Sequence, residues 1–227
     1  MAITYLEDWV TQGLGVSATI SASNSGWKTG DFITVAVIFA SDVAVTAQTI
    51  SNDGDPISWV AIEEASASLN TRIVLFAGRV THPTPPTQIS ITATAGSLLN
   101  CRKALFVAAH RGDAGKSVSD MMQNVWLGTG GADVTQSIPA TAHGSCFWFI
   151  CGDATATNTF VAAADCTLLH TFDNASFTGA LVAPSQQPLQ SGMPFTIGES
   201  DTGARVAWIA WEVSAAPDYW LMGQSML

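Results

Sequence analysis

The sequence predicts an all-β fold, an antiparallel β-sandwich of about a dozen strands with at most one short helix. The main observation is the stretch 30–40, GDFITVAVIFA, in which a Gly-Asp turn precedes nine residues that are β-branched, aromatic or small. This stretch has no helical period, and its composition and turn-rich flanks favour a strand buried on both faces. Three further stretches have the same character: 71–80, 104–109 and 204–213. Such strands must be covered on both sides, so we expect one sheet to pack on another.

The composition indicates a protein with a neutral, polar surface. Only 11% of the 227 residues are charged, against about 25% in an average soluble protein. Ser, Thr, Ala, Asn, Gln and Gly must therefore cover much of the surface, which suits a protein that contacts other protein, although any β-rich chain with many Ser/Thr strands has this composition. The 18 acids and 8 scattered bases give a net charge of −10, which argues against binding nucleic acid or anionic membranes through basic side chains.

The N-terminus and the cysteines indicate synthesis in a cytoplasm. The opening MAITYLEDWV has no basic region typical of a signal peptide, and no apolar run approaches the roughly 18 residues of a membrane span. In that compartment the four cysteines are free thiols rather than disulfides. They show no C-x-x-C spacing, so a zinc site is disfavoured. Cys146 and Cys151 are five residues apart, so on one strand they would point to opposite faces.

The chain divides into an N-terminal arm or edge strand (1–15), a β-sandwich domain (16–215) and an apolar C-terminal tail (216–227). The expected strands are 16–22, 32–39, 43–50, 57–62, 72–80, 88–95, 101–110, 134–138, 146–151, 168–172, 179–183, 194–198 and 204–213. Residues 117–125 are expected to form one short helix or an irregular excursion. No period is exact, so we do not claim an internal repeat.

No motif for catalysis or cofactor binding is present. The sequence lacks H-x-x-H, H-E-x-x-H, G-x-S-x-G, a phosphate-binding loop and G-x-G-x-x-G. Asp53 and Asp55 are calcium candidates, because oxygen ligands alternate around Gly54, but the later carboxylate of a full calcium loop is missing and a tight turn is favoured. A glycan hydrolase would need two acids facing each other across a cleft, and it ranks last among the functions considered.

The tryptophans and the C-terminus supply the candidate contact residues. Trp59, Trp148, Trp208 and Trp211 fall on expected strands and are interpreted as core, whereas the tryptophans near ends or loops, including Trp27 and Trp126, are better candidates for partner contact. The tail is apolar to its last residue, so it must be buried on its own sandwich or on a neighbouring subunit. The predicted interface residues are Trp9, Trp220, Leu221, Met222, Met226 and Leu227.

Several strand motifs together resemble a known group of proteins. In order they are the early G-D-hydrophobic strand 30–37, a turn followed by a tryptophan strand at 53–59, R-x-x-L-F-x-A at 72–77, the Thr-rich strand 88–95 and the Ala/Trp-rich strand 204–213. Over about residues 16 to 213 the chain resembles phage-encoded β-sandwich proteins of jelly-roll or lectin-like type. The stretch 114–131 and the apolar tail depart from that pattern.

The resemblance implies a structural role in a virion. The family's motifs occur in virion decoration proteins, tail components and carbohydrate-binding modules, and they carry no catalytic residues. We therefore expect a non-enzymatic capsid decoration or cement protein without a cofactor, made in the host cytoplasm and located in the virion. Its expected partners are the major capsid protein and copies of itself, as a trimer or another homo-oligomer, with no nucleic acid and no membrane. The alternative is a tail-associated or lectin-like glycan-binding module, which would need exposed tryptophan or tyrosine on a sheet face, or calcium at Asp53 and Asp55.

Overall fold

A computed structural model shows a chain built almost entirely of antiparallel strands, as the sequence predicts, with one short helix in the described part. The structure describes residues 4–15, 19–24, 26–40, 45–68, 71–95, 101–111, 116–130, 133–138, 145–153, 160–174, 177–185, 195–200 and 206–214.

The described strands form four sheets. Sheet A has the order β1 (Thr4–Gly15), β8 (Cys101–Arg111), β3 (Phe32–Ala40), β6 (Thr71–Arg79), β5 (Val60–Ser68). Sheet B has the order β2 (Thr19–Ser23), β7 (Gln88–Ala95), β4 (Val45–Asn52). Sheet C has the order β13 (Cys166–Asn174), β14 (Phe177–Pro184), β11 (Cys146–Asp153), β16 (Val206–Val213), β9 (Met122–Gly130). Sheet D has the order β10 (Asp133–Ile138), β15 (Phe195–Ser200), β12 (Val161–Ala162).

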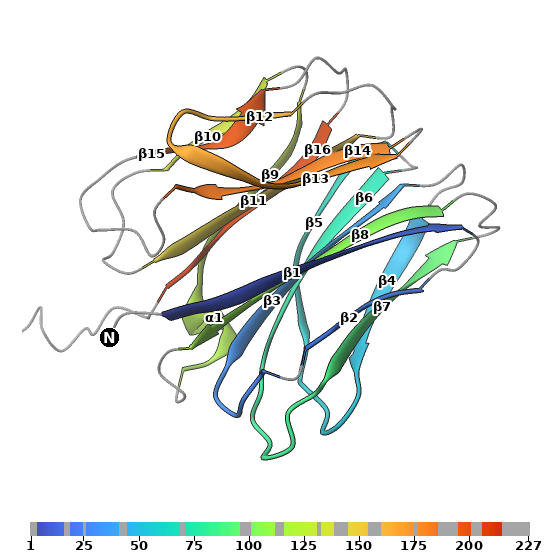
Figure 1. Cartoon of the computed structure of the whole chain (residues 1–227), viewed down its shortest axis with the longest axis vertical. Coiled ribbons are helices and arrows are strands. Elements are labelled where there is room, and N and C mark those ends of the chain that lie inside the picture. The colour runs from blue at the N-terminus through green and yellow to red at the C-terminus, as the bar shows by residue number, and fades with distance from the viewer. Residues whose placement is uncertain are drawn as a thin grey trace, which may run out of the picture.

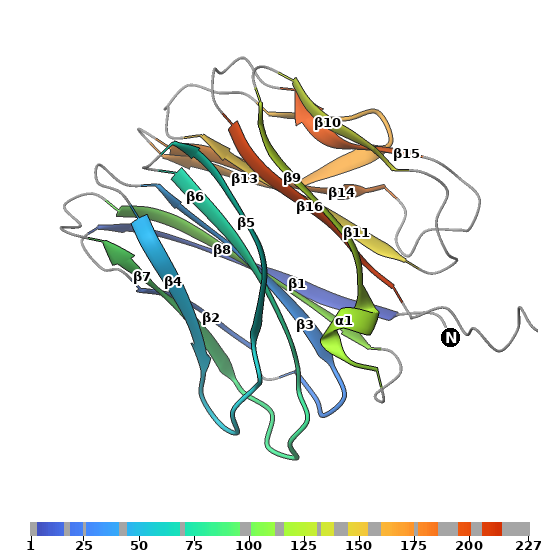
Figure 2. The ribbon, with the colours of Figure 1, turned by 180° about the vertical axis from the view of Figure 1, so that it is seen from behind.

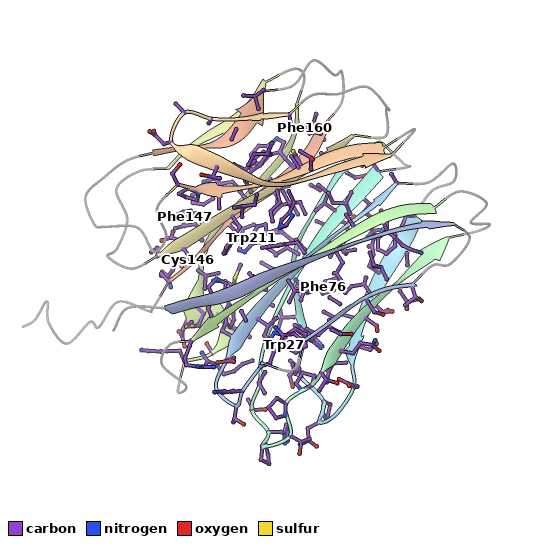
Figure 3. All side chains as sticks on the ribbon, viewed as in Figure 1. Trp27, Phe76, Cys146, Phe147, Phe160 and Trp211 are labelled. Carbon is purple, nitrogen blue, oxygen red and sulfur yellow. The ribbon has the colours of Figure 1, made fainter. Side chains whose placement is uncertain are left out.

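The sheets stack in four layers, in the order B, A, C and D (Figures 1 and 2). Each of the three spaces between layers holds a hydrophobic core. Trp27 and Phe76 belong to the core between sheets A and B, Trp211 to the core between A and C, and Phe147 and Phe160 to the core between C and D (Figure 3). The sequence predicted one sandwich of two packed sheets, whereas the structure contains four packed sheets.

Strand β3 shows why the middle sheets need this arrangement. Every residue of β3 is buried. Ile33 and Val35 point into the core shared with sheet B, and Ala36 and Ile38 point into the core shared with sheet C. A strand that is apolar on both faces requires a layer on each side, so the prediction made from residues 30–40 is confirmed.

The two halves of the chain have the same strand order. Replacing each strand of the first half by the strand eight places later converts β1-β8-β3-β6-β5 into β9-β16-β11-β14-β13, which is sheet C, and β2-β7-β4 into β10-β15-β12, which is sheet D. Strands β2 and β10 start at Thr19 and Asp133, 114 residues apart, and β3 and β11 start at Phe32 and Cys146, again 114 residues apart. The sequence, which has no exact period, supported no claim of a repeat, and the repeat is seen only in the topology.

Each half wraps as a jelly roll. In the first half β1 pairs with β8, β2 with β7 and β3 with β6, so strands from the two ends of the half pair in nested order. The second half repeats these pairings with β9 and β16, β10 and β15, and β11 and β14. Strand β5 departs from the pattern, because it pairs with β6 in sheet A and does not join sheet B.

Two elements differ from the sequence prediction. Strand β5 begins at Val60 and continues to Ser68, where the sequence suggested a strand at 57–62 and then a loop. As the edge strand of sheet A, β5 tolerates charged and small residues on its exposed side. The expected helix is only the short α1 (Val118–Met121), which Ser117 and Asp120 cap reciprocally, and the chain then enters β9 directly.

Candidate interaction surface

Sheet B has one apolar face and one hydroxyl-rich face. In β2 the side chains of Ile20 and Ala22 are buried, whereas Thr19 and Ser23 are exposed. Strand β7 repeats the alternation, with Ile89 and Ile91 completely buried in the core shared with sheet A. The period-2 pattern read from residues 16–22 and 88–95 therefore places hydroxyl groups on the outside of the four-layer stack.

The strand register aligns these hydroxyl groups in rows. Thr92 of β7 lies opposite Thr19 of β2 and Thr49 of β4, which gives a row of three threonines across the sheet. The next row, two residues along, consists of three serines, Ser21, Ser90 and Ser51. We call this surface the hydroxyl face, and it comprises Thr19, Ser21, Ser23, Thr49, Ser51, Gln88, Ser90 and Thr92.

Hydrogen bonds within the hydroxyl face hold its side chains in place. The hydroxyl groups of Ser21 and Ser90 are 2.7 Å apart, and those of Thr19 and Thr92 are 3.0 Å apart. The hydroxyl group of Thr49 donates to the carbonyl oxygen of Thr92 at 3.3 Å. A hydroxyl both donates and accepts, so each group keeps capacity for a further partner. The result is an ordered and uncharged hydrogen-bonding surface.

The calcium candidates lie in the turn that follows β4. The carboxylate of Asp53 accepts hydrogen bonds from the backbone N–H groups of Thr87 and Gln88, both at 2.7 Å, and from the Thr87 hydroxyl at 2.5 Å. These bonds, that of the Thr87 hydroxyl above all, lower the pKa of Asp53. Asp55 accepts a bond from the backbone N–H of Thr84 at 3.3 Å. Both carboxylates thus tie the turn to the segment before β7, which is the tight-turn interpretation.

Asn52 completes this turn and anchors a tryptophan. Its side-chain oxygen accepts from the indole N–H of Trp59 at 3.0 Å and from the backbone N–H of Ile57 at 3.2 Å. Gly78 of β6 leaves the space for these groups, since a Cβ there would meet Ile57 at 2.6 Å and Trp59 at 2.7 Å. Trp59 is therefore a half-buried cover on sheet A rather than a strand residue.

The buried ionisable groups contact other parts of the chain. Asp31, which is fully buried, accepts bonds from the Nε and Nη2 atoms of Arg111 at 2.9 and 3.0 Å and from the backbone N–H of Lys28 at 2.8 Å. On sheet C, the buried carboxylate of Glu212 accepts a 2.6 Å bond from the side chain of Asn124.

His110 joins the two halves of the molecule. It lies at the end of β8 and is completely buried, and its Nε2 atom accepts a 3.2 Å bond from the indole N–H of Trp148 on β11. Burial lowers the pKa of His110 to about 3, so the ring is neutral. This hydrogen bond therefore crosses from the first half of the chain to the second.

The cysteines whose side chains the structure describes are free thiols, as expected: Cys146, Cys151 and Cys166. Cys146 belongs to the core between sheets A and C, and Cys151 to the core between C and D. The prediction that these two point to opposite faces is confirmed. Burial raises the pKa of Cys146 to about 12, so this thiol is unreactive. In the described ranges no group of three His, Cys, Asp or Glu residues is arranged to hold a metal ion.

The tryptophan side chains that the structure describes belong to cores. Trp27 is only 4% exposed, so its predicted role in partner contact is wrong. Trp126 and Trp208 are half-buried on the face of sheet C that points to sheet D, where they stack on Phe147 and Phe149 with ring centroids 6.2 and 5.7 Å apart. None of the described indoles is fully exposed, so they offer no flat aromatic platform for a glycan.

The predicted interface residues are only partly placed. Trp9 lies on β1, the edge strand of sheet A, opposite Val107 of β8, so residues 4–15 form an edge strand. The other predicted interface residues, Trp220, Leu221, Met222, Met226 and Leu227, lie outside the described residues. The predictions for the tail therefore stay predictions.

Sequence reasoning missed the hydroxyl face as a surface. The alternation in residues 16–22 and 88–95 was visible, but the alignment of Thr19, Thr92 and Thr49 depends on which strands are neighbours and in what register. A triplet of short Ser/Thr-alternating strands is the signal that could have indicated it.

Comparisons with known proteins identify no relative of this chain. No family model matches the chain, and no match is found among curated proteins or among solved structures. Within the described ranges, no helix is long and apolar enough to cross a membrane.

Proposed function

We propose that the protein is a non-enzymatic structural component of a phage virion. It is a capsid decoration protein, and it stabilises the head by contacting the major capsid protein and copies of itself. The observation that carries this proposal is the hydroxyl face, an ordered and uncharged surface on a chain of net charge −10. Such a surface suits permanent contact with another polar protein surface, where any charge would have to be desolvated or paired.

The interior supports a structural role. Asp31 and Arg111 join β3 to β8, His110 and Trp148 join sheet A to sheet C, and Glu212 lies under Asn124 at the edge of sheet C. These polar groups fasten strands and sheets to one another. Buried hydrogen bonds that join strands and sheets make a fold more rigid, which suits a structural role.

Small contacts are sufficient for this role. At about 25 cal/mol per Å² of buried apolar area, a few hundred Å² at each joint contributes several kcal/mol. The hydroxyl face itself is polar, so this contribution needs apolar surface such as the tail 216–227. A shell repeats the joint many times, so the sum resists expansion of the head. The location in a virion, and synthesis in the host cytoplasm, rest on the resemblance of the strand motifs to phage β-sandwich proteins.

The test is binding to heads of the phage whose genome encodes the chain. Purified protein is added to heads prepared without it, and it should co-sediment with them. These heads should then withstand a higher temperature or pressure before they open than heads without the protein. Static light scattering of the free protein reports whether it also forms oligomers. A chain that stays monomeric and leaves the heads unchanged contradicts the proposal.

A further inference from the structure

Two edge strands, one from sheet A and one from sheet C, lie beside each other along one side of the molecule. Strand β5 is the last strand of sheet A, β9 is the last strand of sheet C, and the two are neighbours in space (Figure 2). Among the described residues, β5 pairs only with β6 and β9 only with β16. The core between sheets A and C therefore reaches the surface along these two strands.

Apolar side chains are exposed on both of these strands. Val60 of β5 pairs with Ala77, and Leu127 of β9 pairs with Ile209, and both partners belong to the core between sheets A and C. Side chains that lie opposite each other in antiparallel strands share a face, so Val60 and Leu127 form part of the rim of that core. They are 45% and 43% exposed, and among the large apolar side chains that the structure describes only Val161 is exposed to a similar degree.

Partly buried apolar residues connect these two positions. Ile62 of β5 and Met122 and Val125 of β9 pack against the same core without being fully buried. We call the strip formed by Val60, Ile62, Met122, Val125 and Leu127 the seam. An apolar strip in water is stabilised when another apolar segment covers it.

The tail 216–227 starts at one end of the seam. The backbone N–H of Ser214, which follows β16, donates a 3.0 Å bond to the carbonyl oxygen of Met121, the last residue of α1. Strand β9 begins at the next residue, Met122. The described part of the chain therefore brings the tail to the place where β9 and the seam begin.

Strand β5 begins at the same end. Arg79, the last residue of β6, is close enough to Asp120 of α1 to interact with its charge. Val60, the first residue of β5, pairs with Ala77, two residues before Arg79. Both β5 and β9 thus run away from α1 in the same direction, and a segment that starts beside α1 can follow the two strands together.

The tail has the length and the composition to cover the seam. At about 3.3 Å per residue, the seam from Met122 to Leu127 is about 17 Å long. Residues 215–227 reach about 40 Å when extended. The tail contains one charged residue, Asp218, and its large apolar residues are Tyr219, Trp220, Leu221, Met222, Met226 and Leu227.

We infer that the tail 216–227 lies along the seam of its own chain and covers Val60 and Leu127. Attachment beside the seam gives the tail an effective concentration in the millimolar range, which the tail of a second copy reaches only in concentrated solution. Alternate residues of an extended segment point to opposite sides, so one set of the tail's apolar side chains covers the seam. The other set stays outside, where it remains available for the contact with neighbouring proteins proposed above.

Limited proteolysis of the full chain with chymotrypsin, followed by mass spectrometry, tests the inference, because residues 219–221 are cleavage sites for this protease. The variants Val60→Asp and Leu127→Asp place a charge on the seam that a covering tail would have to bury. Val161→Asp makes the same change at an exposed valine of β12 in sheet D and is the matched control. Circular dichroism melting verifies that all three variants fold, since each replaces an exposed residue.

We expect the tail of the wild type and of Val161→Asp to be cleaved at least about tenfold more slowly than a synthetic peptide of residues 214–227, at a rate that does not change on dilution of the protein. Val60→Asp and Leu127→Asp should lose most of this protection. A wild-type tail cleaved as fast as the peptide, or seam variants that protect it like the wild type, overturns the inference. Protection that disappears on dilution also overturns it, because the tail would then lie on a second copy. Co-sedimentation with heads is a separate measurement, so either proposal can fail without the other.

Discussion

The two halves of the chain reach one strand order with two different cores. Between sheets A and B the core is mainly aliphatic, with Ile33, Val35 and Val37 contributed by β3. Between sheets C and D the equivalent strand β11 contributes Phe147 and Phe149. Strand order therefore depends on the alternation of buried residues and on turn positions, while the size of the side chains is free to vary.

The aromatic core fits because small residues lie beside the large ones. Trp126 of β9 pairs with Ala210 of β16, and Trp208 pairs with Gly128. A Cβ at Gly128 would be 3.0 Å from the indole of Trp208. Large and small side chains alternate across neighbouring strands, so the layers keep a normal separation despite the bulk. The comparison teaches that packing compensates locally, within a fixed topology.

The largest expected effect compares equivalent core positions. Val35 and Phe149 are 114 residues apart, as β3 and β11 are, and both are fully buried. Phe149→Ala should lower the free energy of unfolding by about 3–5 kcal/mol, because it leaves a large cavity and removes the stack on Trp208. Val35→Ala should cost about 2 kcal/mol. Urea denaturation measures both, and equal losses would mean that the aromatic core has collapsed around the cavity.

The second prediction concerns His110, whose matching position in the second half holds Val213. His110 pairs with Phe32 at the end of β8, and Val213 pairs with Cys146 at the matching place of β16. The pKa of His110 is lowered to about 3 in the folded chain, whereas the unfolded value is about 6.5. The unfolded state therefore binds the proton more readily, and stability present above pH 6.5 is lost as the pH falls toward 3.

Between pH 7 and pH 4 this loss is about 3 kcal/mol. His110→Gln keeps an acceptor for the Trp148 indole and removes the titration, so its unfolding free energy should depend less on pH by that amount. Unfolding by urea at several pH values measures the difference. The control is His82→Gln, at an exposed histidine, which should retain the pH dependence of the wild type, and a similar flattening in this control would contradict the assignment to His110.

The third prediction compares two glycines under tryptophan side chains. A Cβ at Gly78 would be 2.6 Å from Ile57 and 2.7 Å from Trp59, whereas at Gly128 its nearest contact is 3.0 Å from Trp208. Gly78→Ala should therefore cost about 1–3 kcal/mol through overpacking, and Gly128→Ala clearly less. Thermal denaturation ranks the two variants. The reverse order would show that Trp59 and Ile57 move away from a new Cβ more easily than Trp208 does.

The smallest effect concerns the turn that follows β4. Asp53→Ala removes the acceptor of three hydrogen bonds and should cost about 1–2 kcal/mol near neutral pH, and Asp55→Ala less than that. Because the pKa of Asp53 is lowered in the fold, its contribution is present above the unfolded pKa and is lost as the pH falls through the folded value. Chemical denaturation near pH 7 and near pH 2.5 should show the difference between the variants disappearing in acid.

Much of the strand pattern was readable before the structure. Residues 88–95 alternate so regularly that their buried and exposed faces were assigned correctly, and the stretches 32–39 and 204–213 were recognised as buried. Strand β5 was misjudged because Glu63 and Glu64 suggested a loop. Edge strands carry charges on their open side without losing their pairing, so composition alone could not identify β5.

The repeat and the candidate surface were not readable in the same way. Val35 and Phe149 share a place in the fold but not a residue type, so the two halves show no exact period. The hydroxyl rows depend on pairing between β2, β7 and β4, which are far apart in the chain. Pairing register is decided by how the whole sheet buries its apolar face.

The sequence by itself determined that the chain is all-β, where most strands lie and which side of each amphipathic strand faces water, because these properties follow from residue type and a period of two. Only the tertiary structure decided that the strands form two equivalent jelly rolls packed through sheets A and C, and that Thr19, Thr92 and Thr49 align on one surface. Which strands become neighbours cannot be decided strand by strand, because the pairing must bury the apolar faces of all strands of a sheet at the same time.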